Sequence, residues 1–448
     1  YTGGGIFFIF LTMKRVLLIG NGAREHVIGE TLKRFGAQVF TYGKARNPGL
    51  VELSEGYEVG GLKDFDAMRE FARKVGPDFA VVGPDDPIAD GTADMLLEIE
   101  IHSVAPLQTV ARLESSKSFT RDLLAKYEIP GNPQFKVFYD DSGMEEWLKE
   151  LGEDFVVKAD GLMGGKGVKV SGDHLNGHAE ALAYARECLE GGGRVMIEEK
   201  FVGQEFSLMS FCDGAATAEM PAVQDHKRAY EGDKGPNTGG MGSYSDANGS
   251  LPFLQQSDLD EAAEITRRVA KALFEETGAK FKGIMYGGFD ATAKGVRLIE
   301  YNARFGDQEA LNVLPILETD FVSVCEAVIA GDLKSLPVKF EAKATVCKYI
   351  VPEGYPENPK KGQKVEVGAI PDGIKMYYAS VDQTDEGLIM SSSRAIGLVG
   401  IADTIEEAEK AVQASCSAVS GPVFYRKDIG TQELIQQRVA MMQSLRGE

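Results

Sequence analysis

A lysine and a glycine-rich loop follow an apolar run in the segment VVKADGLMGGKGV. Lys158 closes the apolar run, and Lys166 lies inside the loop. Two cations beside backbone amides that can approach closely suit a polyphosphate. We predict strands at 155–158 and 168–170 on either side of this loop, and its glycines suit a lid that closes over phosphates.

A second segment, LIEYNARFGD, supplies oxygen ligands far away in the sequence. Its residues Glu300, Asn302 and Arg304 are spaced two apart, so on a strand they would share one face. A carboxylate and an amide carbonyl are hard oxygen ligands that suit Mg²⁺. The two segments together predict a protein that uses ATP with Mg²⁺, with Mn²⁺ as the alternative ion.

Length and charge limit the possible classes of protein. A chain of 448 residues predicts about two to four domains. The net charge of −20 argues against nucleic-acid or anionic-membrane partners, because both attract positive charge. Five scattered cysteines without metal spacing predict free thiols in a reducing cytoplasm. Residues 1–12 contain an apolar stretch too short to span a membrane, and we interpret them as an extension before Met13.

Residues 13–113 alternate short apolar strands with helices, which predicts a doubly wound parallel sheet. The predicted strands are 16–19, 40–42, 79–82 and 103–105, and the predicted helices are 24–35, 65–75 and 94–99. Ligands bind beyond the carboxyl ends of such strands. Two loops, GNGAREH and GPDDPI, follow predicted strands there.

The loop GNGAREH is similar to a dinucleotide fingerprint, but Glu25 replaces its third glycine. Three interpretations stay open: an NAD site, a plain strand–helix turn, and a turn that presents amides and Arg24 to a small anion. Arg24 could instead form a salt bridge with a neighbouring carboxylate. We expect His26 to be structural.

Residues 114–338 carry the nucleotide segments. Serines cap a helix that opens at Lys117, which is either a solvated lysine or a phosphate contact. After a predicted strand at 195–199, the backbone of KFVGQE could bind an adenine edge, and Glu205 could accept hydrogen bonds from ribose hydroxyls.

Two further segments are dense in charge and in glycine. QDHKR at 224–228 precedes GPNTGGMG at 235–242, which is too rich in glycine to be regular structure. This arrangement suits close approach to a ligand, and the alternative is a flexible linker. His226 is either a base or a histidine that merely hydrogen bonds.

Residues 339–448 contain short predicted strands with turns, including 344–351 and 395–401. A helix over 404–420 begins with a capping box formed by Thr404 and Glu407. The tail therefore predicts a β-rich domain.

These segments resemble the ATP-grasp family and, within it, the glycinamide ribonucleotide synthetases. The resemblance runs from Met13 to about Gly430 and rests on IGNGAREH, VVGPDDPI, SKSFTRD, VVKADGLMGGKGV, IEEKFVGQEFS, QDHKR, GPNTGGMGSYS, IEYNARFGDQE, VPEGYP and FYRKDIG. QDHKR followed by GPNTGGMG separates these synthetases from biotin carboxylase relatives.

The resemblance implies a multidomain α/β and α+β fold. It has an N-terminal doubly wound parallel sheet (13–113), a central ATP-grasp domain (114–338) with a mobile lid at about 134–202, and a C-terminal β-rich domain (339–448). It implies that glycine is ligated to 5-phosphoribosylamine through glycyl phosphate, at the expense of ATP, in purine biosynthesis. The enzyme would be a cytoplasmic monomer or dimer.

The resemblance also implies roles for single residues. ATP would be bound by Lys117, Lys158, Gly164, Gly165, Lys166, Gly167, Glu198, Glu199, Phe201, Val202 and Glu205. Substrates would be bound by Gly22, Arg24, Gly83, Asp225, Lys227, Asn237, Thr238, Gly239 and Gly240. Glu300 and Asn302 would hold the metal, and Arg304 and Lys158 would be catalytic.

The chain departs from the family pattern in two places. It has Asp85 and Asp86 where a glutamate and a small residue are expected, and Gly288 where related sequences carry a polar metal ligand. Asp290 is the alternative for a third ligand. Two rival functions are an ATP sensor without turnover, which should have lost residues such as Glu300, and another carboxylate–amine ligase of purine synthesis.

Overall fold

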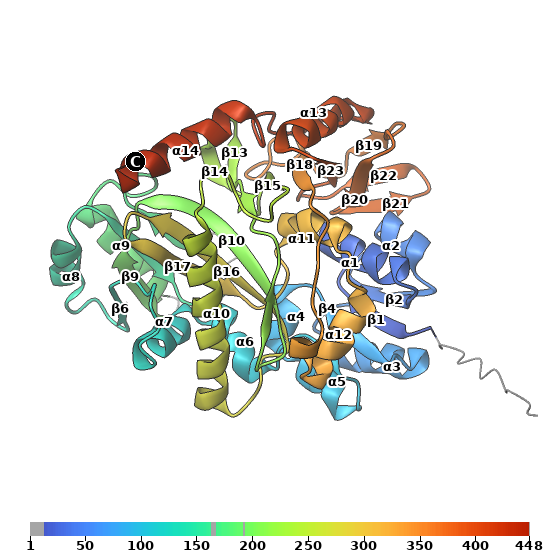
Figure 1. Cartoon of the computed structure of the whole chain (residues 1–448), viewed down its shortest axis with the longest axis horizontal. Helices are drawn as coiled ribbons and strands as arrows, with labels where there is room; N and C mark the ends of the chain where they lie inside the picture. Colours follow the sequence, from blue (N-terminus) through green and yellow to red (C-terminus); the bar gives the residue numbers. More distant parts are fainter. Residues whose placement is uncertain (1–12, 163–166, 191–192, 448) are drawn as a thin grey trace, which may run out of the picture.

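The computed structural model describes residues 13–162, 167–190 and 193–447 (Figure 1). Residues 1–12, interpreted above as an extension, and the predicted phosphate contacts Gly164, Gly165 and Lys166 lie outside the described residues. Across the described ranges, no helix is long and apolar enough to cross a membrane.

The N-terminal part is a five-stranded parallel sheet in the order β3-β2-β1-β4-β5, which confirms the predicted doubly wound fold. Its strands are β1 (Arg15–Ile19), β2 (Gln38–Gly43), β3 (Gly56–Val59), β4 (Phe79–Val82) and β5 (Ser103–Val104). Its helices are α1 (Ala23–Arg34), α2 (Pro48–Leu53), α3 (Phe65–Val75), α4 (Asp85–Asp90) and α5 (Thr92–Glu98). Because β1 pairs with β4, the loops that follow these two strands lie side by side.

The central sheet is antiparallel, in the order β11-β10-β16-β17. It contains β10 (Gly203–Cys212), β11 (Thr217–Glu219), β16 (Gly283–Thr292) and β17 (Gly295–Asn302), and α6 (Gln108–Ser115), α7 (Lys117–Lys126) and α10 (Gln256–Thr277) pack beside it (Figure 1). The register shifts between Gly288 and Phe289, so Gly288 lies opposite Glu300. The strand ends at Asn302, and the expectation that Arg304 continues its face is wrong because the chain bends there.

A third sheet has the order β6-β9-β7-β8 and an apolar core of its own. It consists of β6 (Phe135–Phe138), β7 (Phe155–Ala159), β8 (Val168–Val170) and β9 (Val195–Glu199), with helices α8 (Met144–Leu151) and α9 (His178–Glu190). Trp147, Phe155 and Ile197 lie in this cluster, which is separate from the main core. A separate core is the property that a movable lid requires.

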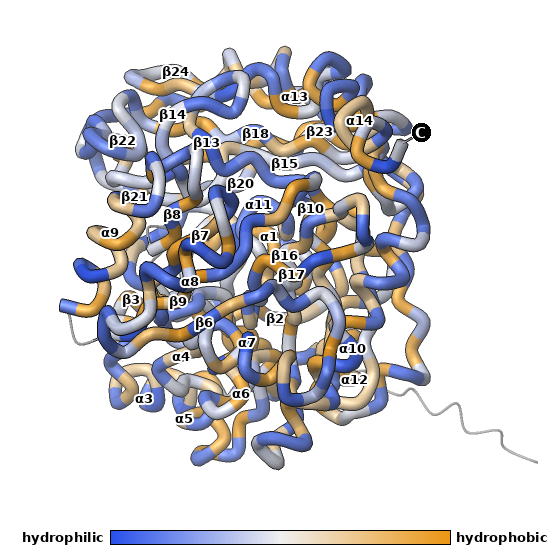
Figure 2. Tube along the Cα trace, turned by 90° about the vertical axis from the view of Figure 1, so that its left-hand side faces the viewer, coloured by the Kyte–Doolittle hydropathy of each residue, from blue (hydrophilic) through white to orange (hydrophobic). Residues whose placement is uncertain are grey.

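The C-terminal strands share a sheet with the QDHKR and GPNTGGMG segments, in the order β12-β15-β18-β23-β20. These strands are β12 (Gln224–Asp225), β15 (Gly242–Ser245), β18 (Ala344–Pro352), β20 (Ile374–Tyr378) and β23 (Ile396–Ala402), and β25 (Val423–Phe424) pairs with β18. Figure 2 shows apolar stretches along interior strands such as β16 and β23, whose side chains are mostly buried. The sheet therefore joins the candidate substrate segments to the tail.

Two expectations for these regions are wrong. The glycine-rich run is not wholly irregular, because its two ends belong to β14 (Lys234–Asn237), which pairs with β13 (Arg228–Tyr230), and to β15. The helix that begins after Thr404 is α13 (Ile405–Ser415), which ends before 420 because β24 (Val419–Ser420) pairs with β19 (Lys364–Val367). The remaining strands and α-helices are β21 (Val381–Thr384), β22 (Gly387–Met390), α11 (Asp307–Val313), α12 (Phe321–Ala330) and α14 (Gln432–Arg446).

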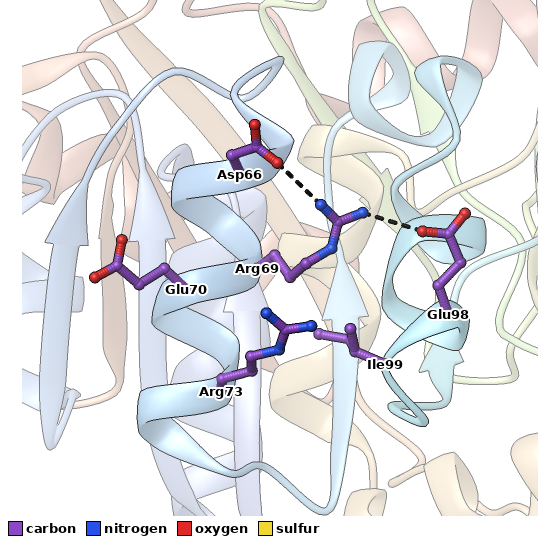
Figure 3. Close-up of a pocket in the computed structure, with 6 residues that line it drawn as sticks. All are labelled: Asp66, Arg69, Glu70, Arg73, Glu98 and Ile99. Atoms are coloured by element: carbon purple, nitrogen blue, oxygen red, sulfur yellow. Dashed lines mark hydrogen bonds and ion pairs between the residues drawn. The ribbon is translucent and has the colours of Figure 1, made fainter.

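A surface crevice of about 600 Å³ lies between α3 and α5 (Figure 3). Arg69 pairs with Asp66 of its own helix and, across the crevice, with Glu98 of α5, at 3.0 Å to each carboxylate. None of the residues that line this crevice belongs to a candidate nucleotide, substrate or metal motif.

Candidate active site

Lys158 lies in a buried ionic triad at the end of β7. Its ammonium group is 2.5 Å from Glu198 Oε1, and the Arg121 guanidinium forms a fork with the same carboxylate at 2.8 and 3.1 Å. Burial favours the neutral acid, but Arg121 and Lys158 hold the pKa of Glu198 below its usual value. Burial lowers the pKa of Lys158, although Glu198 opposes the change. The triad fixes Lys158 in place, and the Glu198 side chain is committed to it.

The triad also reaches the metal-ligand strand. Lys158 Nζ donates to the Ile299 carbonyl at 3.1 Å, and Arg121 donates to the Leu298 and Ile299 carbonyls at 3.0 and 2.7 Å. The sequence interpretation missed Arg121. Arg121 could have been identified from the motif SKSFTRD, because it is a charged residue on the buried face of α7.

Glu300 is half-buried, and within the described residues its carboxylate has no hydrogen bond or ion pair with another side chain. Burial alone would raise its pKa, but Lys227, Lys158, Lys117 and Arg304 hold the pKa of Glu300 below its usual value. An ionised carboxylate without a partner, beside the Asn302 amide, is a donor set that suits a hard divalent cation.

Few side chains are placed to act as a third protein ligand for the metal. Gly288, opposite Glu300, has no side chain to offer, and Asp290 lies opposite Glu205 instead, one strand repeat away. Burial raises the pKa of Asp290 to about 7. In the described part of the chain, no group of three His, Cys, Asp or Glu side chains is arranged to hold a metal. Most of the remaining ligands would have to come from phosphate oxygens and water.

Arg304 lies beyond β17, in the bend before α11. Its Nη2 is 3.0 Å from Glu114 Oε1 and donates to Asn302 Oδ1 at 3.0 Å. Burial opposes ionisation, but Glu114 and Asp85 raise the pKa of Arg304. Burial alone would raise the pKa of Asp85. The positive charges of Arg304 and Arg24 instead hold the pKa of Asp85 below its usual value. The unexpected aspartate in GPDDPI therefore interacts electrostatically with Arg304, and Glu114 is a further residue near Arg304 that the sequence interpretation missed.

The start of α7 is hydrogen-bonded to the residues that directly follow β7, where the glycine loop begins. Lys117 Nζ donates to the Gly161 carbonyl at 2.7 Å, and Ser118 Oγ donates to Asp160 Oδ2 at 2.6 Å. Ser116 caps the helix, as predicted, by accepting from the Phe119 amide. Lys117 is therefore at the loop that would cover phosphates, and Asp160 connects that loop to the central domain.

The predicted adenine segment runs from β9 into β10. Glu199 accepts from the Gln134 amide at 3.1 Å, and Val202 exposes half of its surface, 51%. Phe201 is half-buried between them. An exposed apolar side chain beside a strand end can cover a flat base, so the position of Val202 is compatible with the predicted role.

Glu205 and Lys227 connect the nucleotide segment to QDHKR. The Lys227 ammonium contacts the Glu205 carboxylate closely and lies 3.9 Å from Asp225 Oδ2. Burial raises the pKa of Asp225 to about 8, and Lys227 opposes the rise while Glu205 and Glu309 add to it. Several carboxyl groups thus share one cation, and a positively charged ligand group bound there would favour their ionised forms.

The loop between β14 and β15 is held in place by hydrogen bonds. The Thr238 amide donates to the Lys227 carbonyl at 2.7 Å, and the Gly240 amide donates to Thr238 Oγ1 at 3.0 Å. Gly240 has φ +104°, and a Cβ there would come within 2.1 Å of the Gln308 side chain. Asn237, exposed at the end of β14, and Gly239 complete the predicted set. The flexible-linker interpretation does not fit this bonding.

The two front loops meet around Glu25. Its carboxylate accepts from the Gly22 amide at 2.6 Å and from Arg24 Nε at 2.7 Å. A Cβ at Gly83 would lie 2.0 Å from Glu25 Oε1. Because Glu25 places a negative charge where a dinucleotide would place its pyrophosphate, the loop does not suit NAD. Arg24 thus forms a salt bridge with the neighbouring Glu25, which was the alternative to an anion contact. It also donates to the Phe305 carbonyl at 3.1 Å.

Neither histidine singled out from the sequence is placed to act as a base. His26 Nδ1 accepts from the Tyr378 amide at 3.0 Å, which confirms a structural role. His226 is 2% exposed, and burial lowers its pKa to about 3. Its two ring nitrogens have no partner among the described residues, so the expectation of a hydrogen-bonding ring is wrong as well.

The fold and this constellation define an ATP-grasp ligase, which binds ATP together with a divalent metal. More narrowly, the chain belongs to the phosphoribosylglycinamide synthetase family. The model of the family's N domain matches residues 14–114, that of its ATP-grasp (A) domain matches 115–310, and that of its C domain matches 345–432.

Three relatives illustrate the similarity. The chain is 47% identical to a phosphoribosylamine–glycine ligase from Methanosarcina barkeri over 435 residues, which is 97% of this chain and 100% of that protein. It is 47% identical to a phosphoribosylamine–glycine ligase from Methanocaldococcus jannaschii, over 96% of this chain and 100% of that one. A crystal structure of phosphoribosylamine–glycine ligase from Thermotoga maritima superposes with a TM-score of 0.78 at 28% identity, over 92% of this chain and 99% of that one.

Proposed function

We propose that this chain ligates glycine to 5-phosphoribosylamine at the expense of ATP, and that it releases glycinamide ribonucleotide, ADP and phosphate in purine biosynthesis. The observation that carries the proposal is the convergence on one site of a divalent-metal donor pair, a fixed lysine and a surplus of carboxylates. The full-length similarity to phosphoribosylamine–glycine ligases supports the choice of substrates.

The first step forms glycyl phosphate. A glycine carboxylate oxygen attacks the γ-phosphorus, and the bond from that phosphorus to the bridging oxygen of ADP breaks. Lys158 and Lys117 neutralise phosphate charge, and Arg304 stabilises the transferring group. Glu198 holds Lys158 in place by the 2.5 Å ion pair.

Glu300 and Asn302 would hold the divalent ion, which supplies charge neutralisation between the phosphates. Their donor atoms are oxygens only, which favours Mg²⁺, and Mn²⁺ is the alternative. The ATP base and ribose would lie along Glu199, Phe201, Val202 and Glu205, and the lid with its own apolar core, at about 134–202, would close over the phosphates.

In the second step the amine nitrogen of phosphoribosylamine attacks the glycyl carbonyl carbon. The bond from that carbon to the phosphate oxygen breaks, and the proton that the nitrogen loses passes to the departing phosphate or to water. Asp225, with Lys227 and the loop from Asn237 to Gly240, would hold the glycine. An ammonium group bound there would offset the repulsion among Asp225, Glu205 and Glu309.

The phosphoribosyl group would lie at the front loops. Gly22, Arg24 and Gly83 follow β1 and β4 at the carboxyl edge of the parallel sheet. Arg24 supplies a cation there, next to Asp85 and Arg304. The amine would then point from the front domain toward the central site.

The test is a coupled measurement of phosphate release and product mass with ATP, glycine and freshly made phosphoribosylamine. We expect one phosphate and one glycinamide ribonucleotide per ATP, and none when either substrate is left out. A protein that binds ATP without turnover would release no phosphate. A different carboxylate–amine ligase would accept another acid or another amine in the control reactions and leave these two unused.

A further inference from the structure

Arg394 belongs to the C-terminal part of the chain, and its guanidinium lies at the candidate substrate site. It lies between β22 and β23, and its side chain is 15% exposed. Its guanidinium lies 4.7 Å from the centre of the Tyr349 ring. None of the motifs in the sequence includes it, and neither step of the proposed reaction uses it.

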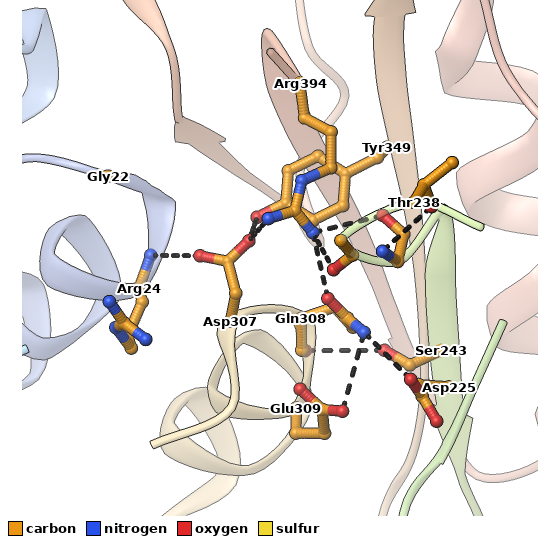
Figure 4. Close-up of polar contacts among 12 residues, drawn as sticks. Gly22, Arg24, Asp225, Thr238, Ser243, Asp307, Gln308, Glu309, Tyr349 and Arg394 are labelled. Carbon is orange, nitrogen blue, oxygen red and sulfur yellow. Dashed lines mark hydrogen bonds and ion pairs between the residues drawn. The ribbon is translucent and has the colours of Figure 1, made fainter. Parts of the chain in front are cut away.

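One side of the guanidinium holds the glycine loop. Arg394 Nη1 contacts the Gly239 carbonyl closely and donates to the Gly240 carbonyl at 3.1 Å and to Gln308 Oε1 at 3.1 Å (Figure 4). Gln308 Nε2 in turn lies 3.4 Å from Asp225 Oδ2. The arginine thus fixes the loop by its backbone and reaches the buried carboxylate through one amide side chain.

The other side of the guanidinium holds Asp307. Arg394 Nη2 is 2.9 Å from Asp307 Oδ2, and Tyr349 Oη donates to the same oxygen at 2.6 Å. The Arg24 amide donates to Asp307 Oδ1 at 3.3 Å. Burial would raise the pKa of Asp307, but Arg394 and Arg24 hold it below its usual value, so the carboxylate stays ionised. Figure 4 shows this carboxylate between the front loop and the C-terminal arginine.

We infer that Arg394 is a positioning residue that sets the affinity for glycine and phosphoribosylamine together, by holding the Thr238–Gly240 loop and the Arg24 loop in one network through Asp307. This inference rests on the proposed function for the identity of the two substrates. It assigns a role in the reaction to the C-terminal domain. Charge-assisted hydrogen bonds of this kind are among the stronger ones in proteins, so their loss should be measurable.

The test compares Arg394→Gln with Lys375→Gln. Lys375 also joins the C-terminal part to the front domain, by a 2.7 Å ion pair with Glu30, but it touches neither loop. We expect Arg394→Gln to raise KM for glycine and for phosphoribosylamine by about tenfold each and to leave KM for ATP unchanged. Lys375→Gln should change none of the three.

A second measurement does not depend on activity. Hydrogen exchange at the amides of Thr238, Gly239 and Gly240 should be faster in Arg394→Gln than in the parent chain and unchanged in Lys375→Gln, without any substrate. If Asp307→Asn is added to Arg394→Gln, the effects on KM should be far from additive, because both changes break one network.

An equal rise in all three KM values, or unchanged exchange in the loop, would overturn the inference, since a merely structural arginine would give those results. A parent chain that makes no glycinamide ribonucleotide would contradict the proposed function instead. The exchange measurement would still decide whether Arg394 holds the loop.

Discussion

The nucleotide side and the substrate side of the site are built differently. On the nucleotide side, Lys158, Glu198 and Arg121 form a closed triad that comes from α7 and the lid sheet, and it bonds to the backbone of β17. On the substrate side, Asp307 and Gln308 connect front, central and C-terminal segments through Arg24 and Arg394.

This difference separates two tasks. Phosphoryl transfer needs fixed charges beside the phosphates, and a local triad can supply them. Joining two small substrates needs two loops at a set separation, and side chains from different domains can hold it. Changes on the nucleotide side should therefore affect stability or turnover, and changes on the substrate side should affect KM.

The largest expected effect is on stability, from Glu198→Ala. The change leaves Lys158 and Arg121 buried without their carboxylate, which costs about 3–5 kcal/mol when one partner of a buried ion pair is removed. Urea denaturation would measure the loss. The neighbouring Glu199→Ala is the matched control, and it should cost about 1 kcal/mol because it loses hydrogen bonds to Gln134 alone. Equal losses in the two variants would mean that the buried triad contributes no more to the free energy of unfolding than an exposed hydrogen bond does.

Glu300→Ala should come next. We expect turnover to fall by at least about 10²-fold, the scale of removing one preorganised electrostatic group, with stability nearly unchanged because the carboxylate has no protein partner among the described residues. Steady-state rates at saturating Mg²⁺ check this. Glu264→Ala, which breaks an exposed ion pair on α10, should keep full activity. Parent-like rates in Glu300→Ala would contradict the metal role.

Arg24→Ala should raise KM for phosphoribosylamine more than KM for ATP or glycine, by about 1.5–3 kcal/mol of substrate binding. The ion pair with Glu25 complicates the comparison, and Glu25→Gln resolves it because that variant weakens the pair and keeps the guanidinium. Varying each substrate in turn gives the three KM values. If Glu25→Gln reproduces the whole effect, the salt bridge and not a phosphate contact explains it.

A pH trend in stability is also expected from Asp225. Its pKa of about 8 in the folded protein lies above the ordinary value of 3.8, so the folded state binds the extra proton more tightly. This contribution to stability is complete below the ordinary pKa and is lost as the pH rises through about 8. The stability of Asp225→Asn relative to the parent should therefore increase from pH of about 5 to about 9. A stability difference that does not change with pH would mean that Asp225 is ionised throughout this range and would contradict the account.

The sequence was sufficient where periodicity or a motif fixes local structure. The helix 65–75 and the strand 79–82 were placed correctly because apolar spacing alone determines them. The spacing of Glu300 and Asn302 correctly predicted that they lie on one strand. The bend after Asn302 and the ion pair between Arg304 and Glu114 from α6 could not be predicted in the same way, because Glu114 lies far away in the sequence.

Arg394, Tyr349 and Asp160 could not be assigned from sequence, because their importance depends on partners far away in the chain. Arg394 meets Gly239 across a separation of 155 residues. The same reason explains the shorter α13, since β24 pairs with β19, which is distant in sequence. Long-range pairing is the information that a local pattern lacks.

The most direct test of the proposed reaction uses glycine labelled with oxygen-18 in both carboxylate oxygens. If the carboxylate attacks the γ-phosphorus, one labelled oxygen must leave with the phosphate when the amine displaces it, and the other must stay in the amide. Mass spectrometry of the released phosphate and of glycinamide ribonucleotide should therefore find one labelled oxygen in each. Phosphate without label would contradict the glycyl phosphate intermediate and, with it, the proposed roles of Lys158, Arg304 and the metal pair.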